Sequence, residues 1–393
     1  MAITFPSSPT NGQTFTSGNK TWQWDGTTWL AYGASLSPTV LKVDAANARV
    51  GVNNQSPAYA LDVNGTIEGT QFLQGTDYLS PYQGFRNKAI NGGFDIWQRG
   101  TSFSNPASGS YIADRANILY DGSGATRTIS QGQFDPYVSG ASITATPPTG
   151  TSPTYFLRYN QSVAGSSASY NILYINRTED VRVLAGKTVT VSFYAKAAAN
   201  LTIGGVYFEQ VFGSGGSPSS NVYSTISGST SVTTSWQRFS YTVAVPSASG
   251  KVIGSSANSS YTGIIMYLPI NTTFTLDIWG LQVEEGSVAT PFEQRPIGTE
   301  LALCQRYYYT SGTVYSMAYM SMNTNQTGEI LTWAFPVTMR AVPTAVQNFV
   351  NGDNTVLANM FLYNNYLSIK VYPFNTGYGY GAFSYGFNVS AEL

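Results

Sequence analysis

The sequence predicts an all-β protein. Turn signals such as Asn-Gly, Asp-Gly and Gly-Gly recur at short intervals between short runs of β-branched and aromatic residues. Helical periodicity is nearly absent, and the one candidate helix covers Gly298 to Arg306. With 393 residues, 42% of them hydrophobic, the chain is long enough for two or three domains with cores of their own.

Residues 1–34 form a separate N-terminal module. Trp22 and Trp24 alternate along one predicted strand and therefore share a face, Asp25-Gly26 is a hairpin turn signal, and Trp29 follows it. A segment this short, without metal or disulfide, is too small for an independent core. It is either a hairpin held together by its own aromatic packing or a module completed by sister chains or a docking partner. We expect the second.

Residues 35–85 predict a short β shaft. Leu41-Lys-Val43-Asp44 recurs imperfectly as Leu61-Asp-Val63-Asn64, and each copy carries a thin apolar stripe. One chain cannot cover such stripes, so repeats of this kind stack or associate to bury them. A plain β linker is the alternative.

Residues 86–296 carry the densest strand pattern. Val189, Val191 and Phe193 alternate with hydroxyl side chains, which is typical of a half-buried strand. Several such runs, separated by Gly/Ser-rich loops, predict an antiparallel β-sandwich. After the candidate helix a second strand-rich block follows, and residues 297–393 are therefore expected to form a C-terminal β-sandwich tip.

Composition excludes several kinds of chemistry. The chain has no histidine and one cysteine, Cys304, which rules out Ser-His-Asp and Cys-His arrangements, His-based metal sites, CxxC sites and intrachain disulfides. A net charge of −1 provides no basic field for nucleic acid. No apolar stretch approaches the roughly 20 residues of a membrane span, so we expect no membrane insertion. No cofactor is expected.

Acidic residues offer few catalytic candidates. Glu284 and Glu285 are adjacent, and adjacent strand residues point to opposite faces, so solvation at a strand end is preferred over a hydrolytic pair. Asp95 and Asp114 lie near Arg99 and Arg115; a structural salt bridge is preferred there over a structural calcium site. The prediction is therefore no catalytic residue and no metal.

The aromatic C-terminal stretch is the candidate binding site. Glycines separate its rings, and an exposed tyrosine offers an apolar face to a sugar ring and a hydroxyl to its oxygens. The residues proposed for receptor binding are Tyr378, Tyr380 and Tyr385. The alternative is that alternate rings form the last core strand.

Several segments resemble parts of tailed-bacteriophage tail fibres, including those of cyanophages. The segments 87–103 and 111–115 look like the entry of a domain found in many such fibres, and 278–293 looks like its last strand and exit. Segments 306–309 and 335–344 resemble the domain that often follows. Residues 22–29 resemble an N-terminal module of cyanophage structural proteins, and the repeats at 41–64 are similar to shaft units.

The resemblance implies a homotrimer with an intertwined shaft and a jelly-roll sandwich similar to a carbohydrate-binding module. It implies a virion tail protein whose N-terminus docks on baseplate or tail proteins, here through Trp22, Trp24 and Trp29. The expected role is non-catalytic attachment to host cell-surface polysaccharide. A glycan-cleaving tailspike depolymerase and a purely structural virion protein are the alternatives.

Overall fold

A computed structural model describes most of the chain, in two compact units that divide between Tyr82 and Gln83. The described residues are 4–18, 20–32, 41–44, 48–53, 56, 60–63, 72–74, 77–79, 85–134, 148, 153–312, 318–322, 329–350, 355–373 and 379–393. For residues 31–32, 41–44, 62, 72–74, 77–79, 318–322, 329–331, 345–350, 355–360, 369–373 and 379–386 only the backbone is described.

The N-terminal module is a three-stranded antiparallel sheet with an aromatic cluster on it. Its strands are β1 (Thr14–Ser17), β2 (Lys20–Trp24) and β3 (Trp29–Tyr32). Trp22, Trp24 and Trp29 are half-buried, and Trp29 stacks on Phe5 with ring centroids 5.3 Å apart. The β2–β3 connection has four residues, 25–28, where Asp25 accepts hydrogen bonds from two backbone N–H groups. The rings on this sheet therefore pack mainly on one another.

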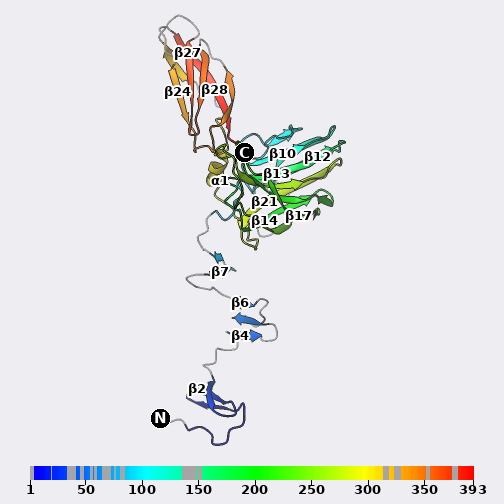
Figure 1. Cartoon of the computed structure of the whole chain (residues 1–393), viewed down its shortest axis with the longest axis vertical. Helices are drawn as coiled ribbons and strands as arrows, with labels where there is room; N and C mark the ends of the chain where they lie inside the picture. Colours follow the sequence, from blue (N-terminus) through cyan, green and yellow to red (C-terminus); the bar gives the residue numbers. More distant parts are fainter. Residues whose placement is uncertain are drawn as a thin grey trace, which may run out of the picture. The chain divides into compact units, whose positions relative to one another are not determined.

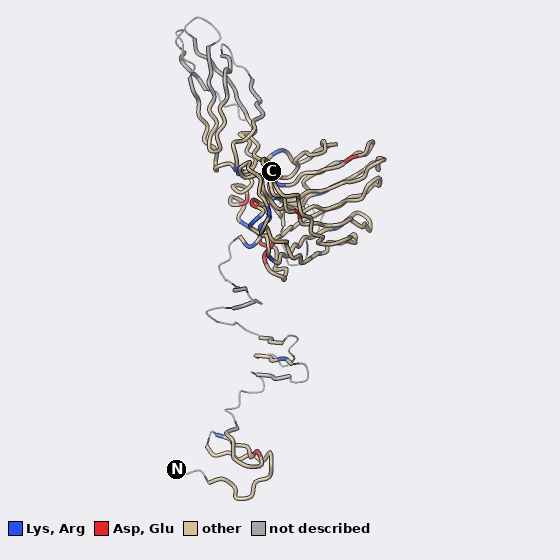
Figure 2. Tube along the Cα trace, viewed as in Figure 1, with Lys and Arg blue, Asp and Glu red and all other residues tan. Residues whose placement is uncertain are grey.

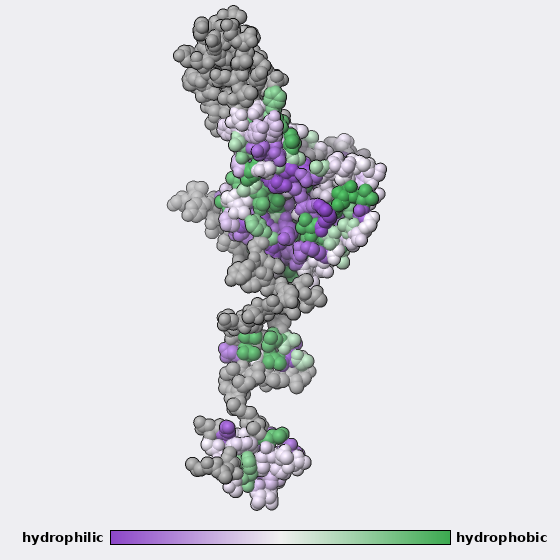
Figure 3. Space-filling model, turned by 60° about the vertical axis from the view of Figure 1, so that its left-hand side comes forward, coloured by the Kyte–Doolittle hydropathy of each residue, from purple (hydrophilic) through white to green (hydrophobic). Residues whose placement is uncertain are grey.

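The second part of unit 1 consists of two very small sheets. The first contains β4 (Leu41–Asp44), β5 (Arg49–Val52) and β6 (Leu61–Val63); the second contains β7 (Phe72–Gln74) and β8 (Asp77–Leu79). Both copies of the predicted repeat, β4 and β6, pair with β5, one antiparallel and one parallel. Leu61 is 58% exposed, and hydrophobic side chains show at the surface here (Figure 3). Leu61 of the apolar stripe is thus uncovered within one chain, whereas Val50, Val52 and Val63 are half-buried.

Unit 2 begins with a two-layered β-sandwich, as the sequence predicts (Figure 1). The five-stranded sheet contains, in spatial order, β10 (Ala116–Tyr120), β13 (Asn171–Thr178), β20 (Tyr261–Tyr267), β16 (Val206–Val211) and β17 (Val222–Ser227). The six-stranded sheet contains β19 (Gln237–Ala244), β14 (Thr188–Ala197), β21 (Phe274–Glu285), β12 (Tyr155–Val163), β11 (Thr126–Gln133) and β9 (Ser102–Ser104). A further pair is β15 (Leu201–Ile203) with β18 (Thr230–Val232).

The two sheets bury one continuous core between them. Val189, Val191 and Phe193 of β14 lie in it, which confirms the predicted alternation. Leu173 of β13 and Phe208 of β16 reach the same core from the opposite sheet. Burial of these side chains provides the main stabilisation of the sandwich, at about 25 cal/mol per Å² of apolar surface.

The segment 87–103 closes one end of the sandwich through backbone contacts. The Asn87 side chain donates to the Leu281 carbonyl oxygen and accepts from two backbone N–H groups. A Cβ on Gly92 would lie 2.0 Å from that same carbonyl oxygen, so only glycine fits there. Asn91 links Ile96 to Asp114 in the same way. These residues of the fibre-like motif have structural roles.

Helix α1 (Ile297–Gln305) follows the sandwich, one residue earlier at each end than the sequence predicts. Cys304 lies fully buried on it, and burial raises the pKa of its thiol, so it behaves as the predicted small hydrophobe. The C-terminal strands are β22 (Tyr308–Thr310), β23 (Ala318–Met322), β24 (Glu329–Ala334), β25 (Thr344–Val350), β26 (Thr355–Leu362), β27 (Tyr366–Pro373) and β28 (Gly379–Ser390). Strands β22, β23 and β25 pair with β28, and β24 and β26 pair with β27.

Charged residues gather where α1 and the C-terminal strands meet the sandwich (Figure 2). Arg99 forms a salt bridge with Asp114 at 3.6 Å, which agrees with the preferred interpretation for this pair, and another with Glu392 at 3.0 Å. Arg115 pairs with Glu392 rather than with Asp95 or Asp114. Among the described residues, Asp95 forms no ion pair with an arginine, so the salt bridge predicted for this motif involves Asp114 and not Asp95.

The adjacent glutamates have different environments. Glu284 is 1% exposed; it accepts hydrogen bonds from Thr290 and Gln282 and pairs with Arg86 at 3.4 Å. Glu285 is exposed and pairs with Lys187 at 2.7 Å. They point to opposite faces as predicted, but strand-end solvation is wrong for Glu284, because a closed network of donors replaces water around it.

Candidate functional site

Tyrosines line the outer face of the five-stranded sheet, which we call the tyrosine face. It is built on side chains that alternate with the core residues along each strand. Its members are Tyr174 on β13, Tyr207 on β16, Tyr223 on β17, and Tyr261 and Tyr267 on β20. Tyr207 and Tyr261 pack on a small hydrophobic cluster that includes Tyr174 and is separate from the sandwich core.

Strand register brings these rings together. Tyr174 is opposite Ile265, which in turn is opposite Tyr207 on the next strand. Glu209 is opposite Gly263 on one side and Tyr223 on the other. The rings of Tyr207 and Tyr267 meet edge to face with centroids 5.5 Å apart. Aromatic side chains from four adjacent strands therefore form one surface.

Glycines make room for two of the rings to lie along the sheet. A Cβ on Gly263 would lie 2.4 Å from the ring of Tyr174, and one on Gly205 would lie 2.5 Å from the ring of Tyr207. At either position, the side chain of any residue other than glycine would clash with the ring. The missing side chains let the rings lie on the backbone instead of standing upright from it.

Glu209 is the polar centre of the tyrosine face. It is 5% exposed; it accepts hydrogen bonds from the Tyr174 hydroxyl and, at 3.0 Å, from the Asn221 amide. Burial, and then the Glu209 carboxylate, raise the pKa of Tyr174 above its usual range, so its hydroxyl remains a donor. Burial likewise raises the pKa of Tyr223. Both Glu209 oxygens are thus engaged in positioning neighbouring groups.

Two rings of this face are open to solvent. Tyr223 is 57% exposed and Tyr267 is 38% exposed, whereas Tyr174 is buried beneath its neighbours. Exposed tyrosine rings over a fixed polar network offer stacking surface and hydroxyl groups without an entropy cost for ordering the network. Such a surface suits a ligand with apolar faces and many hydroxyls, as sugars have.

The predicted receptor-binding tyrosines cannot be placed in the same way. Tyr378 lies outside the described residues, and so do the side chains of Tyr380 and Tyr385, whose backbone belongs to β28. Phe387, from the same aromatic stretch, is 1% exposed and contacts Tyr309 and Phe335. At that position the alternative, a ring in a core strand, is correct.

The tyrosine face was not predicted from the sequence. The signal that points to it is the alternation Tyr261, Gly263, Ile265, Tyr267, in which glycine interrupts an otherwise aromatic and apolar stripe. Periodicity alone does not say which stripe of a strand faces the core. Both stripes of β20 are apolar, and only pairing with β13 and β16 resolves them.

No three Cys, Asp or Glu side chains of the described residues are grouped as a metal site needs. Within the same residues, no helix combines the length and the apolar character needed to cross a membrane.

Comparisons with known proteins find distant structural similarity only. No family model and no curated protein sequence matches the chain. A CBM4 structure is 18% identical over 50% of this chain and 98% of its own, with a TM-score of 0.27. A family 11 carbohydrate-binding module from Clostridium thermocellum, in complex with a β-1,3-1,4-mixed-linked tetrasaccharide, is 10% identical over 48% of this chain and 98% of its own, with a TM-score of 0.27.

The enzymatically active domain of bacteriophage CBA120 tailspike protein 4 is also similar. It is 11% identical, and the alignment covers 51% of this chain and 22% of the tailspike domain, with a TM-score of 0.29. Each of these similarities therefore extends over about half of the present chain.

Proposed function

We propose that this protein is a non-catalytic glycan-binding tail fibre of a tailed bacteriophage. It acts as a homotrimer in the virion tail and attaches the particle to cell-surface polysaccharide of its bacterial host. The tyrosine face of the sandwich makes the contact with the glycan. No cofactor takes part.

The observation that carries this proposal is the arrangement of exposed rings around Glu209. Tyr223 and Tyr267 supply stacking surface, and the hydrogen bonds to Glu209 hold the layer beneath them in place. Stacking of a sugar on one ring contributes on the order of 1 kcal/mol beyond area burial, so a single face binds weakly. Three copies on one axis raise the avidity for a repeated glycan by roughly 10²–10⁴.

Non-catalytic binding is favoured by the state of the one buried carboxylate of the face. A glycoside hydrolase needs two carboxyl groups on either side of the scissile bond, with one free to donate a proton. Here both oxygens of Glu209 already accept hydrogen bonds from Tyr174 and Asn221.

Virion attachment is assigned to the N-terminal module. Its tryptophans are half-buried rather than fully enclosed, which leaves part of each ring available to a docking protein. The partners proposed are baseplate or tail proteins, and the residues are Trp22, Trp24 and Trp29. The resemblance of residues 22–29 and 87–115 to fibre segments supports this assignment.

The test compares two double variants of the full chain on a glycan array and on host cells. Tyr223→Ala with Tyr267→Ala removes the exposed rings of the tyrosine face, and we expect it to abolish glycan binding. Tyr378→Ala with Tyr380→Ala removes two rings from the C-terminal stretch and is the matched control. Circular dichroism of both variants shows whether the fold survives.

Each outcome decides between the candidate roles. Loss of binding in the tip variant alone places the site at Tyr378 and Tyr380 and overturns the assignment to the sandwich. Release of reducing ends from host glycan by the unchanged protein identifies a depolymerase. Absence of any glycan or cell binding by the unchanged protein leaves a structural virion protein.

A further inference from the structure

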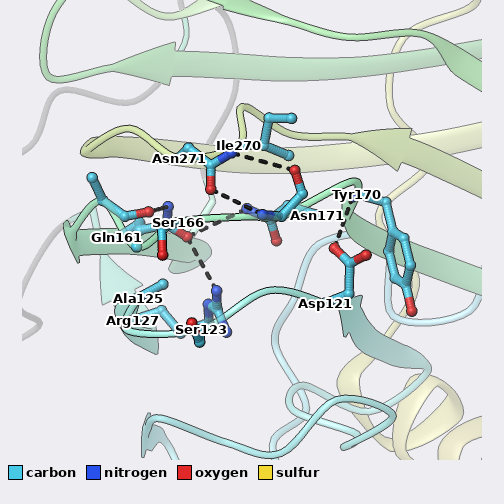
Figure 4. A pocket seen from close by; sticks show the side chains of 13 residues that line it. Asp121, Ser123, Ala125, Arg127, Gln161, Ser166, Tyr170, Asn171, Ile270 and Asn271 are labelled. Carbon is cyan, nitrogen blue, oxygen red and sulfur yellow. Dashed lines mark hydrogen bonds between the residues drawn. The ribbon is translucent and has the colours of Figure 1, made fainter.

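A small hollow lies where three loops of the sandwich meet (Figure 4). The loops connect β10 to β11, β12 to β13 and β20 to β21. The core-facing positions at this end are polar: Arg127 follows the same face as Ile129, and Gln161 the same face as Tyr159. Asn171 likewise lies on the same face of its strand as the core residue Leu173. The sandwich therefore ends in a polar layer instead of an apolar one.

Arg127 is a buried cation with no counter-charge among the described residues. It is 4% exposed, and no described carboxylate forms an ion pair with it. Its guanidinium lies over the ring of Tyr120 at 3.6 Å and donates one long hydrogen bond, 3.5 Å, to Gln161 Oε1. Its Nε has no hydrogen-bond partner. An unpaired charge in such a position costs several kcal/mol, which a bound anion offsets.

Other arginines of the sandwich have stronger partners than Arg127, although the Nε atoms of Arg115, Arg238 and Arg295 also have no hydrogen-bond partner. Arg115 pairs with Glu392, Arg295 pairs with Glu300 at 2.9 Å, and Arg238 donates to Ser192 and to a backbone carbonyl. Those residues have structural partners of the kind that a buried guanidinium needs. Arg127 differs from them in that its one described hydrogen bond, to the side-chain carbonyl of Gln161, is long, and no described carboxylate or backbone carbonyl accepts from its guanidinium.

The rest of the hollow suits a sugar that carries an acid group. At its rim the ring of Tyr170 is 37% exposed and Ile270 is 41% exposed, and these supply apolar surface. Ser123 and Ser166 add hydroxyls. The nearby carboxylate of Asp121 is turned to the backbone N–H groups of residues 169 and 170, at 2.7 and 3.0 Å (Figure 4).

We propose that this hollow is a second glycan subsite, specific for an acidic sugar residue whose carboxylate pairs with Arg127. Bidentate pairing of a carboxylate with the planar guanidinium supplies the missing counter-charge. The sugar ring lies against Tyr170 and Ile270. This inference rests on Arg127 and the hollow, and it is independent of the tyrosine face.

The test titrates the full chain with trigalacturonate, with a neutral galactose trisaccharide, and with inorganic phosphate and sulfate, by calorimetry. We expect trigalacturonate to bind and the neutral trisaccharide not to compete for the same site. Arg127→Gln should weaken trigalacturonate binding by at least about tenfold. Ser166→Trp, which leaves Arg127 intact and obstructs the mouth of the hollow, should do the same. Arg182→Gln, an exposed arginine, is the matched control and should bind normally.

Three results would overturn the proposal. The first is no binding of trigalacturonate, and the second is binding unchanged in both Arg127→Gln and Ser166→Trp. The third is binding of phosphate or sulfate without trigalacturonate, which would assign the hollow to a different oxyanion. Normal binding of trigalacturonate by the Tyr223→Ala, Tyr267→Ala variant separates this site from the tyrosine face.

Discussion

Asp95 shows how a single buried carboxyl influences the stability of the sandwich. Burial, and then the nearby Glu300 carboxylate, raise the pKa of Asp95 to about 6 from its ordinary 3.8. Since the folded pKa lies above the unfolded one, the folded protein binds more protons between these two values. Its stability therefore falls as pH rises through this window, and the loss is complete near neutral pH.

Replacing this carboxyl should stabilise the protein. Asp95→Asn removes the charge, so near neutral pH we expect Tm to rise by about 2–4 °C, the change that ~1 kcal/mol produces in a domain of this size. At a pH well below the ordinary Asp pKa the variant and the unchanged protein should melt together. Thermal unfolding followed by circular dichroism measures both.

Asp121→Asn is the control, because the pKa of Asp121 is shifted in the opposite direction to that of Asp95. Backbone hydrogen bonds from Tyr170 lower the pKa of Asp121, so its ionised form is favoured in the folded state and the substitution should not raise Tm. A fall of Tm near neutral pH in Asp95→Asn would show that an interaction of that carboxylate has been overlooked.

The partner of each charged side chain was harder to predict from the sequence than the motif in which that side chain lies. The motif around Asn87 and Arg99 was recognisable, but whether Arg99 pairs with Asp114 or Asp95 depends on which of the two carboxyls the fold directs toward it. Glu284 illustrates the same limit. Its position at a strand end predicts solvent, whereas Arg86 and Thr290, distant and near in sequence, enclose it.

At the scale of elements, the strands themselves were predictable. Alternation placed Val189, Val191 and Phe193 toward the core, and the helix near 297–305 was found from its short apolar pattern. The tyrosine face was not predictable, because it depends on the order β13-β20-β16-β17 in the sheet. Strands far apart in sequence supply its rings, and a periodic pattern carries no information on which strands pair.

Gly263 provides a test of that face as an assembled element. A Cβ there would meet the ring of Tyr174 at 2.4 Å, so Gly263→Ala must displace the ring from Glu209. We expect a loss of about 1–3 kcal/mol in the free energy of unfolding. Urea denaturation measures it, and glycan binding should weaken in parallel.

Gly228→Ala is the matched control for this substitution. Nothing lies within 4 Å of a Cβ at Gly228, so stability and binding should be retained. Equal effects of the two substitutions would mean that the close approach of Tyr174 has no consequence for the face.

At the scale of the whole molecule, the proposed trimer depends on the small sheet of β4, β5 and β6. Its Leu61 side chain is exposed in one chain, and we expect a mass in solution of three times the chain mass of 42.3 kDa. Leu61→Glu places a charge in the stripe and should yield monomer at micromolar concentration. Light scattering coupled to size exclusion measures the mass of each form.

The control is a second leucine of unit 1. Leu30 is 55% exposed against 58% for Leu61, but it belongs to the sheet of the N-terminal module. Leu30→Glu should therefore keep the trimer. A monomeric unchanged protein would rule out the trimer itself.

The junction between sandwich and C-terminal strands has an evolutionary consequence. On the C-terminal side its described contacts come from a few residues near the base of the block: Glu300, Arg306, Tyr307, Tyr308, Arg340, Glu392 and Leu393. Among the described residues, none of these contacts involves β26 or β27. A lineage that retains this short set of anchors is able to exchange those two strands while the sandwich and its tyrosine face stay unaltered.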